Sequence, residues 1–183
     1  MIAYKGFCSD FTCRSYQFVM GLNVTERANC AKNGFHCAEN PLDCLTYYPQ
    51  MEESIYCIVD AGGDIDEDNY DSKISCTELT IIKQLSREEF FLHALVYMVD
   101  HPKQKWNRYV KADRAESKNG YAIVRGIDPI ARGEKLGDIL AFAKENPNGD
   151  KIEQIALVKI DGKITMPGIW YDIKQITRKD MVE

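Results

Sequence analysis

The chain has 183 residues, of which 45% are hydrophobic, and its formal net charge is −5 at pH 7. This composition allows a packed core without metals or disulfides and excludes a disordered protein. No stretch reaches the roughly 20 apolar residues that a membrane-spanning helix needs, and no secretory signal is recognisable at the start, so a cytoplasmic protein with no membrane contact is expected.

Cysteine and charge are unevenly distributed along the sequence. All seven cysteines precede residue 77, and an odd number without an export signal predicts reduced thiols rather than a disulfide framework. The first hundred residues hold 7 Lys and Arg against 16 Asp and Glu, a net of −9, whereas the remainder hold 16 against 12, a net of +4. The change of sign allows the second part to present a basic face to an acidic partner.

Short strands and two helices are predicted for the first hundred residues. Asn40 and Pro41 are typical of a helix N-cap and first helical position, and Ser86 caps a second helix with acidic residues in its first turn and a broad apolar face. The strands are expected at residues 2–7, 15–19, 34–38, 54–63 and 74–85.

A basic connecting segment and a small β-meander are predicted for the rest of the chain. Asn148-Gly149 and Asp161-Gly162 favour tight turns, because both pairs tolerate positive φ angles. We therefore predict an α+β protein with a mixed N-terminal domain of short strands and two helices. The predicted boundaries are 1–100 for this domain, 101–120 for the connecting segment and 121–183 for the β-rich module.

His36 is the most suggestive single residue, because it stands between a short predicted strand and the helix that Asn40 begins. At the end of a strand it could act as a general base or a polar anchor. A lone histidine is more often a hydrogen-bonded structural residue, so the structural role is expected and the catalytic role is the alternative.

Cys30, Cys37 and Cys44 are spaced seven residues apart with His36 next to Cys37, which raises the hypothesis of a zinc site. Structural zinc sites usually contain ligand pairs two to four residues apart, and this sequence has no such C-x-x-C pair, so no metal is predicted. The acidic stretch 64–71 lacks the residue order of an EF-hand loop and is expected to be a solvated turn.

Cations and aromatic residues alternate in the connecting segment. This pattern suits an acidic protein surface or a nucleic-acid backbone with its bases, although a solvated helix face gives the same composition. The candidate partner-binding residues are Lys103, Lys105, Trp106, Arg108, Lys111 and Arg114.

Four phrases, AYKGF, DFTCRSYQF, GFHCAENPLDCLTYYP and DSKISCTELTII, follow one another over about residues 1–85. Together they resemble a domain of unknown function that is common in bacteriophages, prophages and other bacterial mobile elements. The resemblance implies a viral or mobile-element origin and little chemistry. We expect an accessory protein without a cofactor, in the cytoplasm of a bacterial host. Its expected role is to bind a host protein, with inhibition of a defence system as one such role.

A looser resemblance to ADP-ribosyltransferases rests on Tyr-Lys-Gly at residues 4–6 and Gly-Phe-His at residues 34–36, followed by Tyr47. It implies, as the alternative, a small transferase that uses NAD. No histidine or arginine stands at the first motif, and Glu78 is the candidate for the catalytic glutamate. The catalytic residues under this alternative are Tyr4, His36 and Tyr48.

Overall fold

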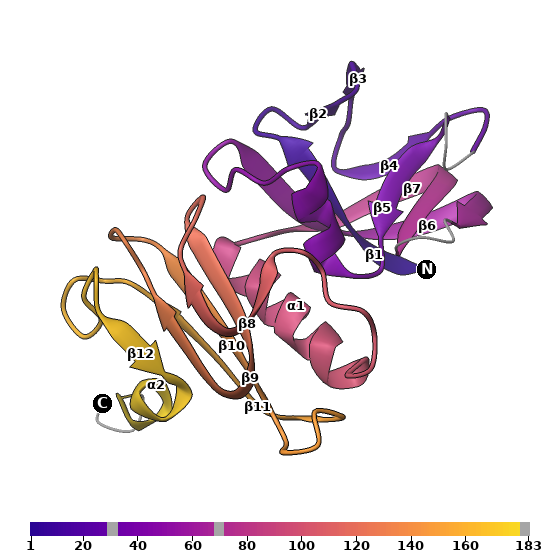
Figure 1. Ribbon diagram of the computed structural model, residues 1–183. Coiled ribbons are helices and arrows are strands. Elements are labelled where there is room, and N and C mark those ends of the chain that lie inside the picture. Colours follow the sequence, from indigo (N-terminus) through magenta and orange to yellow (C-terminus); the bar gives the residue numbers. More distant parts are fainter. Residues whose placement is uncertain (29–32, 68–71, 180–183) are drawn as a thin grey trace. The chain divides into compact units, whose positions relative to one another are not determined.

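The computed structural model describes residues 1–28, 33–67 and 72–179, and it divides into two compact units, residues 1–90 and 91–183 (Figure 1). Strands account for 50% of the structure and helices for 15%. The predicted α+β class is therefore wrong, because the protein consists mostly of β-sheets with small helices.

Unit 1 is built on an antiparallel sheet that closes on itself. The strand order is β4-β7-β5-β1-β6, and β6 also pairs with β7, so that β7, β5, β1 and β6 form a ring. A small separate hairpin, β2 and β3, follows β1. The strands are β1 (Ile2–Cys8), β2 (Thr12–Cys13), β3 (Tyr16–Gln17), β4 (Gly21–Val24), β5 (Phe35–Ala38), β6 (Ser54–Glu67) and β7 (Lys73–Leu85).

The length of β6 and β7 is one reason why the mixed-domain prediction fails. These strands have 14 and 13 residues and pair over most of their length. Residues 64–67, predicted as part of a turn, continue β6, because pairing with β7 outweighs the low strand propensity of the three acidic residues among them. Residues 68–71 of that predicted turn lie outside the described residues.

The predicted helix after Asn40 is a six-residue 3-10 helix, η1 (Pro41–Thr46), rather than an α-helix. Its start is confirmed, since the Asn40 side chain accepts a hydrogen bond from the Leu42 backbone N–H at 3.1 Å. With three residues per turn, Leu42 and Leu45 fall on one line, and both are buried. The short element adds little helix to the unit.

The second predicted helix is confirmed as α1 (Arg87–Asp100). The Ser86 hydroxyl accepts from the Glu89 backbone N–H at 3.0 Å, and the Glu89 carboxylate accepts from the Ser86 N–H at 2.8 Å. This reciprocal arrangement is a capping box, which satisfies two backbone donors at the helix start.

Unit 2 contains a five-stranded sheet in which β9 pairs in parallel with both β8 and β10. The predicted β-meander is therefore wrong, because a meander has antiparallel neighbours throughout. The elements are β8 (Val110–Glu116), β9 (Tyr121–Arg132), β10 (Ile139–Glu145), β11 (Ile152–Lys159), β12 (Trp170–Asp172) and α2 (Ile173–Lys179).

A bend in β9 explains how short connections can join parallel strands. Ser117 N–H donates to the Arg132 carbonyl at 2.9 Å, and Lys118 N–H donates to the Tyr121 carbonyl at 2.8 Å, so both ends of β9 lie beside residues 117–118. A straight strand of this length would separate its ends by more than about 30 Å. The strand must therefore double back, which a sequence pattern does not reveal.

The turn predictions in unit 2 succeed in part. Gly149 has a φ of 69°, and the turn around it joins the antiparallel pair β10 and β11, which confirms that hairpin. Gly162 also has a positive φ of 73°, but the strand that follows, β12, pairs with β9 instead of β11.

Across residues 1–28, 33–67 and 72–179, no helix has the length and apolar character needed to cross a membrane.

Candidate functional site

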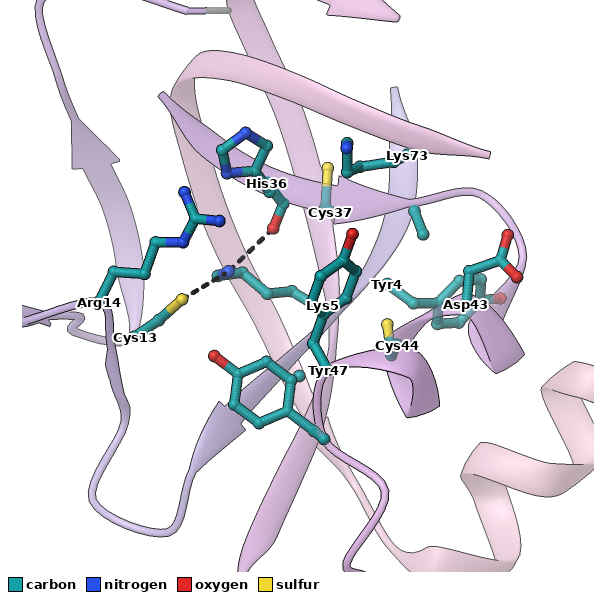
Figure 2. Close-up of a pocket in the computed structure, with 13 residues that line it drawn as sticks. Tyr4, Lys5, Cys13, Arg14, His36, Cys37, Asp43, Cys44, Tyr47 and Lys73 are labelled. Atoms are coloured by element: carbon teal, nitrogen blue, oxygen red, sulfur yellow. Dashed lines mark hydrogen bonds between the residues drawn. The ribbon is translucent and has the colours of Figure 1, made fainter. Parts of the chain in front are cut away.

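A cavity of about 270 Å³ lies in unit 1 (Figure 2). Its walls come from β1, β5, η1 with the tyrosines that follow it, the residues at the tip of the β2–β3 hairpin, and the first residue of β7. Segments far apart in the sequence thus contribute side chains to one hollow.

The three predicted catalytic residues line this cavity together. Tyr4 comes from β1, His36 from β5 and Tyr48 from the chain just after η1, and all three side chains are partly buried. Burial, followed by the nearby Cys44 thiol, raises the pKa of Tyr4. The structure brings the three residues to one site, and their catalytic role stays a prediction.

Lys5 is the most unusual residue at the cavity, because its side chain is charged and the residue is 3% exposed. Its ammonium donates to the His36 backbone carbonyl at 2.8 Å and lies 3.6 Å from the Cys13 sulfur (Figure 2). It also lies 5.0 Å and 5.1 Å from the ring centres of Phe7 and Phe18, a distance at which cation–π attraction operates.

The charge of Lys5 is not neutralised by a carboxylate. Among residues 1–28, 33–67 and 72–179, no Asp or Glu forms a salt bridge with it. An ammonium has three N–H donors, and the described residues supply partners for two of them, a carbonyl and a weak thiol acceptor. A buried cation with these neutral partners favours a negatively charged or strongly dipolar group beside it.

Gly6 allows Tyr48 to form part of the cavity wall. A Cβ placed on Gly6 would lie 2.5 Å from Cδ2 of the Tyr48 ring, so the ring rests directly on the backbone of β1. The Tyr48 carbonyl accepts a hydrogen bond from the Tyr56 hydroxyl, which holds the backbone of this residue in place. Burial, and then the hydrogen bond with the Cys13 side chain, raise the pKa of Tyr48 well above its ordinary value.

Arg14 and Lys73 add two further cations to the cavity wall. Arg14 belongs to the turn between β2 and β3, where Arg14 and Ser15 have φ angles of 47° and 67°. Its guanidinium points towards His36 and the Lys5 ammonium in Figure 2. The left-handed conformation costs a non-glycine residue about 1–2 kcal/mol, so the fold sustains strain to keep this turn.

One acidic residue, Asp43, is among the side chains that line the cavity. Its carboxylate accepts hydrogen bonds from the Ser72 hydroxyl at 2.7 Å and the Ser72 backbone N–H at 3.3 Å. These bonds fix the start of β7, and with it Lys73, against η1.

Two thiols of the zinc hypothesis, Cys37 and Cys44, line the cavity but are poor ligands. Burial raises the pKa of Cys44 to about 12, and the hydrogen bond with Cys76, together with burial, raises the pKa of Cys37. Metals bind the deprotonated thiolate, and the raised pKa of Cys37 and Cys44 disfavours that form. Within the described parts of the chain, no group of three or more His, Cys, Asp or Glu side chains is arranged to hold a metal ion, and Cys30 lies outside them.

Sequence reasoning missed Lys5, Arg14 and Lys73 as a set. A signal for Lys5 was present, since strand alternation places it on the same face as Ala3 and Phe7, both fully buried. No local signal links Arg14 or Lys73 to this face, because hairpin placement and strand order depend on the tertiary structure.

The model of a domain of unknown function, DUF7666, matches residues 1–93. This chain belongs to the DUF7666 family. The resemblance to a domain of unknown function over about residues 1–85 is confirmed, and the match extends into α1. The comparison with curated proteins and the comparison with solved structures each find no match.

The DUF7666 domain contains every residue of the cavity wall. Glu78, the candidate catalytic glutamate, lies on β7 within the same domain but is exposed, and it is absent from the described residues that line the cavity. The geometry therefore supplies aromatic and basic groups at the site without this glutamate.

The candidate partner-binding residues lie in unit 2, beyond the DUF7666 domain, and all six are exposed. Residues 101–109 form turns and irregular chain, so the alternative of a solvated helix face is wrong for them. Arg114 stacks 3.8 Å from the centre of the Trp170 ring, and the Trp106 ring faces the buried Arg125 at 4.7 Å. Binding of a partner by this segment stays a prediction.

Proposed function

We propose that the DUF7666 domain of this protein binds a small anionic molecule in the cavity beside Lys5. The observation that carries the proposal is the buried Lys5 ammonium, which meets a carbonyl and a thiol but no carboxylate among the described residues. A carboxylate or phosphate oxygen placed in the cavity would accept the remaining N–H and offset the desolvated charge.

The distribution of charge supports an anionic ligand. Residues 1–100 contain 7 basic side chains, and three of them, Lys5, Arg14 and Lys73, line the cavity. The same residues contain 16 acidic side chains, and Asp43 is the one among the described residues that lines it. The described wall thus has a formal charge of +2 with histidine neutral, in a half of the chain whose net charge is −9. Such a local excess of positive charge concentrates anions.

The shape and the aromatic lining support a compact ligand with a flat part. A volume of about 270 Å³ lies just below the roughly 300–1,000 Å³ range of ordinary ligand pockets. Tyr4, Tyr47 and Tyr48 place three aromatic rings in the wall, and aromatic rings favour packing against a flat group. A phosphate or carboxylate joined to a ring or short chain would use both features.

Thermal unfolding with inorganic phosphate, adenosine monophosphate and NAD as probes tests the proposal. A ligand that binds the folded state adds about 2.7 kcal/mol of stability at a hundred times its dissociation constant. Lys5→Met and Arg14→Gln should each remove the stabilisation, whereas Lys83→Met, which changes an exposed lysine of the same unit outside the cavity, should retain it. No stabilisation by any anion, or equal loss in the control variant, would refute the proposal.

A second candidate function is NAD-dependent ADP-ribosyl transfer. It is favoured by the meeting of Tyr4, His36 and Tyr48 in one cavity whose cations suit a diphosphate. NAD would have to extend beyond a cavity of this volume. Incubation with labelled NAD and a bacterial lysate tests it: transfer that is lost in Tyr4→Phe and in His36→Ala supports the enzyme, and NAD binding without transfer or hydrolysis speaks against it.

The exposed basic segment supports a further proposal, that the protein is a phage or mobile-element accessory factor that binds a host protein. The observation that supports this proposal is the solvent exposure of all six candidate residues, with the Arg114 guanidinium stacked on the Trp170 ring. Changing Lys105, Arg108 and Lys111 to glutamate should weaken capture of a host protein, and added salt should do the same for the unchanged protein. Capture that is indifferent to both would exclude the segment.

A further inference from the structure

Cys13 combines accessibility and a cationic setting in a way that differs from the other described cysteines. Cys37, Cys44, Cys57 and Cys76 are buried. Cys8 is exposed but does not line the cavity, whereas Cys13 is partly exposed and does. A reactive cysteine needs access to solvent and nearby positive charge, and Cys13 meets both conditions.

The surroundings of the Cys13 sulfur are specific. The Lys5 ammonium lies 3.6 Å from it, and Arg14 is the next residue in the chain and also lines the cavity. Lys5 is almost fully buried and lacks a carboxylate partner among the described residues, so its charge acts at the sulfur and in the cavity. Reagents with negative charge would collect at this thiol.

The backbone holds Cys13 at this place at some cost. Cys13 pairs with Tyr16 across a two-residue turn formed by Arg14 and Ser15, both in the left-handed region. Two-residue hairpin turns of this kind favour asparagine and glycine, and neither is present. Strain of this type is concentrated at functional sites, and here it fixes a thiol and a guanidinium on the same wall.

We infer that Cys13 is a site of thiol–disulfide exchange with small anionic disulfides, of which glutathione disulfide is the representative probe. The Cys13 thiolate attacks one sulfur of the disulfide, a new S–S bond forms to that sulfur, the original S–S bond breaks, and the other half leaves as a thiolate. The proton of the Cys13 thiol goes to solvent, so the step needs no further oxidant. The inference rests on the proposed function, since the same cations would bind the carboxylates of the disulfide.

Such a modification would make the occupancy of the cavity depend on the redox state of the surrounding solution. The mixed disulfide would place a peptide with carboxylate groups across the wall formed by Lys5, Arg14 and Tyr48. A bound anion and the modification would therefore exclude one another.

The test compares Cys13 with Cys8 in the full chain by peptide mass spectrometry. The protein is treated with glutathione disulfide or with the neutral hydroxyethyl disulfide, and the rate of modification at each cysteine is measured. With glutathione disulfide, Cys13 should react about tenfold faster than Cys8, and added salt should reduce this preference. With the neutral disulfide, the preference should be smaller, and Lys5→Met and Arg14→Gln should reduce the rate with glutathione disulfide towards that level.

The outcomes separate this inference from the proposed function. If Cys13 reacts no faster than Cys8 with glutathione disulfide, the inference is overturned, while anion binding is judged independently by thermal unfolding of Cys13→Ser with phosphate. If Cys13 reacts equally well with both disulfides and neither cation variant has an effect, the thiol is merely accessible and the inference is again overturned. If, in addition to either outcome, phosphate fails to stabilise Cys13→Ser, the proposed anion binding is refuted as well.

Discussion

Replacing Gly6 by alanine gives a direct measure of how tightly the cavity wall is packed. The added Cβ would lie 2.5 Å from Cδ2 and 2.9 Å from Cγ of Tyr48. Carbon atoms in favourable contact are about 3.5–4.0 Å apart, so the ring or β1 must move by about 1 Å. Overpacking of this kind costs about 1–3 kcal/mol. Since about 1 kcal/mol shifts Tm by roughly 2–4 °C in a chain of this size, Tm should fall by about 2–12 °C.

Gly62→Ala provides the matched control, because the nearest atom to its added Cβ is 3.7 Å away, at Glu78, and its φ is not in the left-handed region. Its effect on stability should be much smaller. Thermal and urea unfolding, followed by circular dichroism, measure both variants. A second measurement uses the Tyr48→Ala background, in which Gly6→Ala should cost at least about 0.5 kcal/mol less than in the natural sequence.

Two results would refute this reasoning. Equal stability of Gly6→Ala and Gly62→Ala would mean that Tyr48 does not rest on β1. If Gly6→Ala lowers the free energy of unfolding by the same amount in the Tyr48→Ala background, the steric clash of the added Cβ is not with the Tyr48 ring. Anion binding offers a further check, because a displaced Tyr48 alters the cavity and should weaken binding of the anion that stabilises the natural protein.

Three further predictions concern other parts of the chain. Glu145→Ala should lower the free energy of unfolding, measured in urea, by about 3–5 kcal/mol, because its 2.7 Å ion pair with Arg125 is buried and the guanidinium loses its carboxylate. The double variant Arg125→Met with Glu145→Leu should recover most of this loss. A small effect of Glu145→Ala alone would contradict a buried ion pair. The backbone N–H of Lys163, with those that follow it, lowers the pKa of Asp161 to about 2, so its stabilising contribution should be present above its unfolded pKa of 3.8 and disappear as pH falls towards 2. The Tm difference between the natural protein and Asp161→Asn should shrink over that range, and a constant difference would argue against this linkage. Ser15→Gly should raise stability by about 0.5–1 kcal/mol, because glycine adopts the φ of 67° without strain, and a loss of stability would show that the turn is not strained.

Features that depend on a few neighbouring residues were predictable from the sequence. Ser86 and Glu89 form the expected helix start, and Asn40 caps the expected helical turn, because each of these bonds joins residues at most three positions apart. Family membership is likewise carried by the order of residues in the sequence itself.

The same local signals did not determine element type and length where tertiary contacts dominate. Residues 64–67 were predicted as part of a turn, yet they are strand, because residues 74–76 of β7 pair with residues 65–67 of β6. The parallel pairing of β9 depends on a bend at which β8 also shifts register, beside Asp113 with its positive φ of 58°. A pattern of hydrophobic and polar residues contains no information on such a bend.

The candidate site divides in the same way. The sequence by itself determined that Tyr4, His36 and Tyr48 stand beside glycine and strand signals, and it determined the acidic and basic halves of the chain. That these residues share one cavity, and that Lys5 is buried there, was decided by the closure of the sheet. The Lys5 ammonium meets a carbonyl 31 residues away, and its burial depends on Phe7 and Phe18 packing around it. Burial is a property of all the segments that surround a side chain, so it emerges when β1, β5 and η1 come together.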